Sequence, residues 1–122
     1  MALYTPDASV PLGNSYGSLT AGETPTAITP NIAGDSIALV GRYVRLRFAT
    51  AGTIATITLD SVRPSDQGQD GNVVITMPAT AVRYVTIDAS QDRFKQVTGN
   101  VGYVNISYSS VTGLSLEAQY IN

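Results

Sequence analysis

The sequence predicts an all-β protein, an antiparallel β-sandwich or jelly roll with an extended N-terminal arm. From residue 35 onward, β-branched residues and alternation of apolar and polar side chains dominate. Turn signals recur about every ten residues, which is typical of sandwiches and jelly rolls. No segment longer than two turns has helical periodicity. The chain of 122 residues has the length of a single domain, with roughly seven or eight short strands.

Residues 1–34 are predicted to form the arm. The first 41 residues contain four of the six prolines and neither lysine nor arginine. Prolines at these intervals exclude a helix and favour extended backbone, with a short edge strand expected near 26–29. The arm is too apolar for a typical disordered tail, which is the alternative, so it needs a surface on its own sandwich or on a neighbouring subunit. The arm residues expected to make subunit or capsid contacts are Leu3, Tyr4, Val10, Leu12, Tyr16 and Leu19.

Residues 35–122 are predicted to form the sandwich, entered by a strand at 35–41. The run "GRYVRLRFATAGTIATITLD" at 41–60 is expected to be a hairpin around the turn Ala51-Gly52. In the expected register the apolar pairs are Phe48–Ala55, Leu46–Ile57 and Val44–Leu59, and the outward pairs are Arg47–Thr56, Arg45–Thr58 and Tyr43–Asp60. A slip of one residue would expose the whole apolar set, so this register is favoured if the two strands pair.

The C-terminal stretch "YVNISYSSVTGLSLEAQYI" predicts a second hairpin, with its turn at 109–113. Its expected apolar pairs are Tyr108–Leu114, Ile106–Leu116 and Val104–Ala118, and its outward pairs are Ser107–Ser115, Asn105–Glu117 and Tyr103–Gln119. Two amphipathic hairpins predict an antiparallel sheet with one solvated face.

Two further strands are expected between these hairpins, at 72–77, where Pro78 ends the strand, and at 81–87. The segment 88–102 is predicted to be a loop with a short strand near 94–97. The segment 60–72 is rich in oxygen ligands but lacks the spacing of a calcium-binding loop. We expect it to be a hydrophilic loop, with a metal site as the alternative.

The composition disfavours several classes of function. The chain lacks histidine and cysteine, and therefore the usual general base, zinc ligands and thiol nucleophile. We therefore expect no enzyme activity and no cofactor. A net charge of −2 argues against a nucleic-acid partner. No apolar run is long enough to cross a bilayer, and no signal peptide is evident, so we expect no membrane partner and synthesis in a cytoplasm.

Arginines and tyrosines are the candidate contact residues of the sandwich. Arg45 and Arg47 share one face of a strand about 7 Å apart, whereas Arg42 has the opposite parity. We expect the pair to face solvent, or alternatively to form ion pairs with an acidic partner subunit. Tyr43, Tyr84 and Tyr103 fall at outward positions, where amphipathic aromatic rings favour protein or sugar contacts unless the arm covers them.

Three stretches carry a resemblance: "GRYVRLRFATAGTIATITLD", "VVITMPATAVRYVTI" and "GYVNISYSSVTGLSLEA". Together with the N-terminal arm they resemble the small β-sandwich decoration (cement) proteins of tailed-phage heads, over roughly residues 35–121. The resemblance implies a homo-oligomer, often a trimer, on the capsid exterior that clamps neighbouring major capsid proteins. It implies no catalytic residues.

We therefore expect a non-enzymatic virion protein, made in the host cytoplasm, that decorates and stabilises a capsid by binding the outer surface of the major capsid protein shell. A carbohydrate-binding or adhesin-type sandwich, such as a tail or fibre component, is the alternative. Exposed tyrosines favour this second expectation, whereas the lack of tryptophan for stacking on sugar rings disfavours it.

Overall fold

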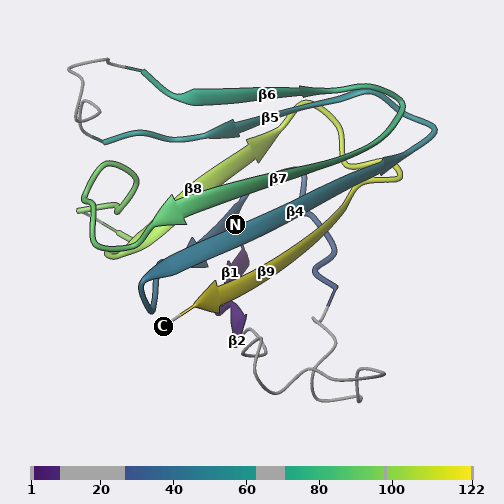
Figure 1. The fold of residues 1–122 in the computed structure, drawn as a ribbon. Helices are drawn as coiled ribbons and strands as arrows, with labels where there is room; N and C mark the ends of the chain where they lie inside the picture. The colour runs from purple at the N-terminus through teal and green to yellow at the C-terminus, as the bar shows by residue number, and fades with distance from the viewer. Residues whose placement is uncertain (1, 9–26, 63–70, 98, 122) are drawn as a thin grey trace, which may run out of the picture.

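A computed structural model describes residues 2–8, 27–62, 71–97 and 99–121 of the chain. These residues form β-strands joined by loops, and they contain no helix, hence none that could cross a membrane (Figure 1). The all-β prediction is therefore confirmed. The strands are β1 (Ala2–Tyr4), β2 (Asp7–Ala8), β3 (Asp35–Ala38), β4 (Tyr43–Ala51), β5 (Ala55–Leu59), β6 (Val73–Met77), β7 (Thr80–Asp88), β8 (Tyr103–Tyr108) and β9 (Ser115–Ile121).

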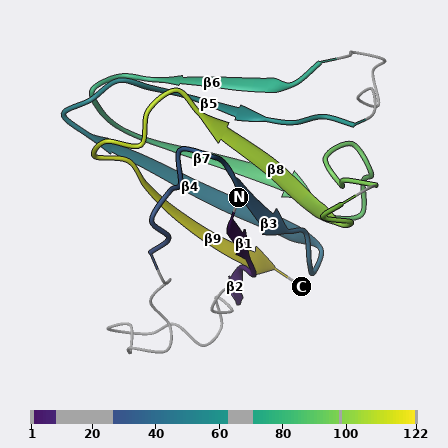
Figure 2. The same ribbon diagram turned by 180° about the vertical axis from the view of Figure 1, so that it is seen from behind.

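The strands form two sheets packed face to face, as Figures 1 and 2 show from opposite sides. The five-stranded sheet has the order β1-β3-β8-β5-β6, and the four-stranded sheet has the order β2-β9-β4-β7. All pairs within β3–β9 are antiparallel. The two N-terminal strands add parallel pairs, β1 with β3 and β2 with β9. The predicted sandwich is thus confirmed, with a parallel strand at one margin of each sheet.

The first predicted hairpin, at 41–60, is wrong. β4 belongs to the four-stranded sheet and β5 to the five-stranded sheet, so the chain crosses between the layers at 52–54. The outward pairs predicted for Arg45, Arg47 and Tyr43 are wrong for the same reason, because β4 pairs with β7 and β9. The predicted apolar face is nevertheless the buried one, formed by Val44, Leu46, Phe48, Ala55, Ile57 and Leu59.

The second predicted hairpin, at 103–121, is wrong in the same way. β8 lies in the five-stranded sheet and β9 in the four-stranded sheet, linked by the crossover at 109–114. Here too the predicted apolar side chains are buried: Val104, Ile106, Tyr108, Leu114, Leu116 and Ala118. Alternation identifies the face that each strand buries, but a hairpin and an interlayer crossover can give the same alternation. In both cases, residues predicted to be neighbours in one sheet point into the core from opposite sheets.

The remaining predicted strands match the structure more closely. β6 and β7 lie within one residue of the expected strands at 72–77 and 81–87, whereas β3 starts as expected at 35 but ends three residues before 41. The strand expected near 94–97 is absent, because this stretch belongs to the loop between β7 and β8. That loop is held by hydrogen bonds from the Gln96 N–H to the Tyr103 carbonyl and from the Gly102 N–H to the Gln96 carbonyl. Most of 60–72 lies outside the described residues.

The described parts of the N-terminal segment lie on this chain's own sandwich. β1 pairs with β3 over three residues, and β2 pairs with β9 over two. Farther along, Ile28 forms an isolated antiparallel bridge to Leu116, in place of the short strand expected near 26–29. The predicted contact residues Val10, Leu12, Tyr16 and Leu19 lie outside the described residues.

The core between the sheets consists of inward side chains from both layers. Phe48 and Leu46 from β4 and Ile106 from β8 are among its largest fully buried members. Burying one such side chain contributes about 1.5–3 kcal/mol relative to leaving it exposed. Because the inward positions of β4 are fully occupied by this core, its alternate residues must point to the outer face of the four-stranded sheet.

A candidate interaction face on the four-stranded sheet

The outer face of the four-stranded sheet is the candidate site, and we call it the arginine face. It is formed by outward residues of the three neighbouring strands β7, β4 and β9. The register aligns them in rows across the strands. One row contains Tyr84, Arg47 and Glu117, and the next contains Thr86, Arg45 and Gln119. Tyr43 lies at the start of β4, and Val82 lies beside Ala49 one row beyond Tyr84.

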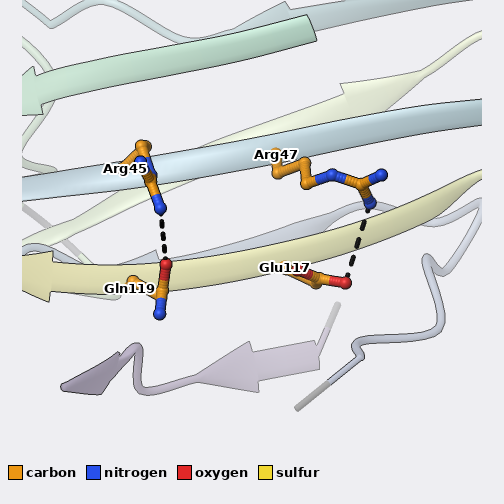
Figure 3. A network of polar contacts seen from close by, with 4 residues as sticks. All are labelled: Arg45, Arg47, Glu117 and Gln119. Carbon is orange, nitrogen blue, oxygen red and sulfur yellow. Dashed lines mark hydrogen bonds and ion pairs between the residues drawn. The ribbon is translucent and has the colours of Figure 1, made fainter. Parts of the chain in front are cut away.

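Arg45 is held from two sides. Its Nη2 donates a 2.8 Å hydrogen bond to Oε1 of Gln119 on β9 (Figure 3). Its guanidinium carbon lies 5.4 Å from the ring centroid of Tyr84 on β7, within the range of a cation–π interaction. Contacts with both neighbouring strands restrict the rotamers of this long side chain. A partner that binds Arg45 therefore has less side-chain entropy to remove.

Arg47 forms an ion pair with Glu117, with Nη1 and Oε1 separated by 3.7 Å (Figure 3). Both side chains are about one-third exposed, so water screens their attraction. An exposed pair of this kind contributes about 0.2–1 kcal/mol. Arg47 is therefore paired with a carboxylate, whereas Arg45 contacts the neutral side chains of Gln119 and Tyr84, which leaves the arginine face locally cationic near Arg45.

Apolar surface lies beside these arginines, along β7. Tyr84 is 59% exposed and Val82 is 41% exposed. Tyr43 is half-buried, with the guanidinium of Arg42 positioned 5.3 Å from its ring centroid. Tyrosine and arginine are enriched in protein interfaces, because each combines a large contact area with hydrogen-bonding groups. The face therefore has the chemistry to bind another protein surface.

The other predicted contact residues do not join this face. Leu3 is 55% exposed and lies opposite Ser36 on the outer side of the five-stranded sheet. Tyr103, which is half-buried, lies on the same outer side, opposite Ala38. Tyr4 points inward against the core, and its hydroxyl donates a 3.5 Å hydrogen bond to the Thr29 carbonyl. The structure thus places the described members of the predicted set on two opposite outer faces, with Tyr4 directed toward the core.

The outer side of the five-stranded sheet differs in charge. Its outward positions on β5, β6 and β8 are neutral: Thr56, Thr58, Val74, Thr76, Tyr103, Asn105 and Ser107. By contrast, β4, β7 and β9 carry Arg45, Arg47, Asp88 and Glu117 at outward positions. The two outer faces are therefore chemically distinct, although both belong to a chain with few charges.

The loop end of the molecule has a separate polar cluster. The Ser90 hydroxyl and backbone N–H donate to Oδ1 of Asp88 at 2.6 and 2.9 Å. These hydrogen bonds hold the pKa of the Asp88 carboxyl below its usual range. Nearby, a shallow cavity of about 190 Å³ is lined by residues of the loop before β8: Asp92, Lys95, Gln96, Val97, Val101 and Gly102. No group of three or more acidic, histidine or cysteine side chains placed to hold a metal occurs within the described ranges.

Sequence reasoning did not identify Glu117 and Gln119 as partners of the arginines. The predicted hairpins placed them opposite Asn105 and Tyr103, whereas the structure places them opposite Arg47 and Arg45. Their parity correctly assigned them to an outward face. Only the pairing of β9 with β4, which joins distant parts of the chain, brings these side chains together.

Comparisons of this chain with models of protein families, with curated proteins and with solved structures found no match.

Proposed function

We propose that this protein is a non-enzymatic structural component of a phage virion, which decorates and stabilises the capsid by binding the outer surface of the major capsid protein shell. The observation that supports this proposal is the arginine face, where exposed Tyr84 lies beside Arg45, itself fixed by two neighbours. The sequence resemblance to capsid decoration proteins supplies the class of partner. The low share of charged residues in this chain reduces the desolvation cost of burying a large part of its surface.

In this proposal, Tyr84 and Arg45 form the centre of the contact. Tyr84 provides exposed aromatic area and a hydroxyl, while Arg45 provides donors for a carboxylate or carbonyl of the capsid protein. Binding energy in protein interfaces is concentrated in a few residues of these types. The Arg47–Glu117 pair would lie at the margin, where it fixes orientation more than affinity.

We also propose that the N-terminal segment, residues 3 to 32, contributes contacts with a neighbouring subunit or capsid protein, beyond the pairs that its strands β1 and β2 already form with β3 and β9 of the same chain. Because β1 and β2 are part of this chain's own sheets, a deletion of the segment would not test partner binding alone. Deleting residues 2–32 would remove both pairs from the sandwich and would alter folding and binding together. Point variants on the arginine face therefore test the capsid proposal more clearly than the deletion.

The test measures co-sedimentation of the purified protein with capsid shells that lack it. Tyr84→Ala and Arg45→Ala should each weaken binding about tenfold or more, as expected for central interface residues. Ser107→Ala, at an exposed outward position on β8 of the other sheet, is the matched control and should bind like the wild type. Wild-type protein that does not sediment with shells would overturn the proposal, as would equal binding by the two face variants and the wild type.

A carbohydrate-binding or adhesin role is the second candidate. The exposed ring of Tyr84 favours it, because an aromatic face bordered by a hydrogen-bond donor can stack on a sugar. Tyr103, which was also expected at an outward position, is half-buried and therefore less suited to this role. Glycan-array binding that is lost in Tyr84→Ala but kept in Tyr103→Ala would support this role over capsid binding.

A further inference from the structure

β6 is an edge strand, at the margin of the five-stranded sheet. Among the described strands it pairs only with β5, so its other side has no neighbouring strand. Figure 1 shows β6 at the outer limit of the fold, beyond β5. Its five residues, Val73–Met77, include neither a charge nor a proline. A margin of this kind leaves backbone N–H and C=O groups free to pair with another strand, and proteins normally protect such margins.

β7, the corresponding margin of the four-stranded sheet, has such protection. Arg83 lies opposite the fully buried Phe48, at a position of inward parity, yet its side chain is exposed. Its Nη1 donates a 3.0 Å hydrogen bond to the Val82 carbonyl. A charged residue at an inward position of an edge strand opposes the addition of another strand. The edge strands β6 and β7 therefore differ: within the described residues, β6 has no charged side chain of this kind.

The side chains of β6 provide apolar surface on both of its faces. Val73 and Ile75 are partly buried against the core, so part of each remains accessible at the margin. On the opposite face, Val74 is 58% exposed. A strand placed beside β6 would cover these side chains as well as pair with the free backbone groups.

We propose that β6 pairs antiparallel with β6 of a second copy of this chain, about a two-fold axis at Ile75. Ile75 then lies opposite its own equivalent, Val74 opposite Thr76 of the second copy, and Val73 opposite Met77 of the second copy. Inward side chains thus lie beside inward side chains, and no charge faces another. A shift of one residue would place apolar inward residues beside outward ones, so the burial pattern of β6 excludes that register. The two five-stranded sheets become one continuous sheet.

This dimer is independent of capsid binding, because β6 and the arginine face belong to different sheets. It also differs from the trimer that the sequence resemblance implies. A two-fold axis closes on two copies, whereas a trimer requires two different surfaces in each contact. The mass of the protein in solution therefore distinguishes these assemblies without any capsid protein.

Sedimentation equilibrium over about 1 to 200 µM protein, a range that covers micromolar affinities, is the test. We expect the mass to approach twice the 12.8 kDa of one chain. Val74→Lys places a charge at an exposed position of β6 and should raise the dissociation constant at least about tenfold. Val82→Lys on β7 is the matched control, because Val82 is also exposed and outward, and it should leave the dissociation constant unchanged.

Amide hydrogen exchange provides a readout that does not depend on a variant. Within Val73–Met77, the amides that do not bond β5 should exchange more slowly as protein concentration rises, while the amides of β7 should be unaffected. A monomer at all concentrations, a trimer, or a dimer that Val74→Lys leaves intact would overturn the proposal. Dimerisation abolished by Val82→Lys would also overturn it, because the contact would then lie at β7.

Discussion

The hydroxyl of Tyr108 donates a 2.7 Å hydrogen bond to Oδ2 of Asp35 inside the core. Asp35 is fully buried at the start of β3, and the N–H of Asn31 donates to the same oxygen at 3.1 Å. Its other oxygen, Oδ1, has no hydrogen-bond partner within the described structure. Because a buried carboxylate is stable only when it is hydrogen-bonded, these two donors determine whether the core tolerates Asp35.

Removing the tyrosine donor should destabilise the fold. We expect Tyr108→Phe to lower the free energy of unfolding by about 1.5–3 kcal/mol, because a hydrogen bond to a charged group is lost and the carboxylate stays buried. Urea denaturation measures this change. Tyr84→Phe removes the same hydroxyl from an exposed side chain and should change stability by less than about 0.5 kcal/mol. Equal effects of the two substitutions would contradict the role assigned to the buried bond.

The same pair predicts a dependence of stability on alkaline pH. Burial, the hydrogen bond to Asp35 and the charge of Asp35 all raise the pKa of Tyr108 above its ordinary value of 10.0. A pKa that is higher in the folded state means that the folded state retains a proton that the unfolded state releases. The stabilisation is therefore fully present below pH 10 and declines as the pH rises above it. Urea midpoints measured from pH 8 upward should show this decline, and it should be shallower in Tyr108→Phe.

Gly113 marks the contact between the two interlayer crossovers. Its φ of +67° lies in the left-handed region, and an added Cβ would collide with the backbone oxygen of Ala51 at the end of β4. Gly113→Ala should therefore destabilise the protein by more than the roughly 1 kcal/mol of left-handed strain alone. Gly102→Ala is the control, since Gly102 has a φ of +83° but no atom near the added methyl. Thermal unfolding that ranks the two variants equally would refute the close approach.

The Arg47–Glu117 ion pair should contribute little to stability. Glu117→Gln is expected to lower the free energy of unfolding by about 1 kcal/mol or less, because both side chains are partly exposed. The difference from wild type should shrink further in about 1 M salt, where the screening length falls to about 3 Å. Urea denaturation at low and high salt measures this difference in the free energy of unfolding. A large loss of stability in Glu117→Gln that salt does not reduce would contradict the description of the pair as exposed and screened.

The burial of each strand could be predicted from the sequence because alternation is a local property. Val44, Leu46 and Phe48 repeat every second residue, and this fixes which side of β4 faces the core. Partner strands could not be predicted in the same way. The turn signals at Ala51-Gly52 and at 109–113 suit a hairpin, but both segments cross between layers.

The partners on the arginine face were beyond prediction for the same reason. Arg45 meets Gln119, 74 residues away, and Tyr84 only because β9 and β7 flank β4. The buried Asp35 was also unexpected, because an isolated acidic residue at the start of a strand is typical of a surface position. Its partner Tyr108 is 73 residues distant, so no local pattern indicates the bond.

Hydroxyl-radical footprinting of Tyr84, with the protein free and bound to capsid shells, tests the proposed capsid contact most directly. Free protein should label readily at Tyr84, which is 59% exposed, and binding should reduce its labelling several-fold. Ile54, which is 65% exposed at the crossover between the sheets, provides an internal reference that should keep its reactivity. Capsid-bound protein in which Tyr84 labels as fast as in the free protein would contradict the proposal that the arginine face is the capsid-binding surface.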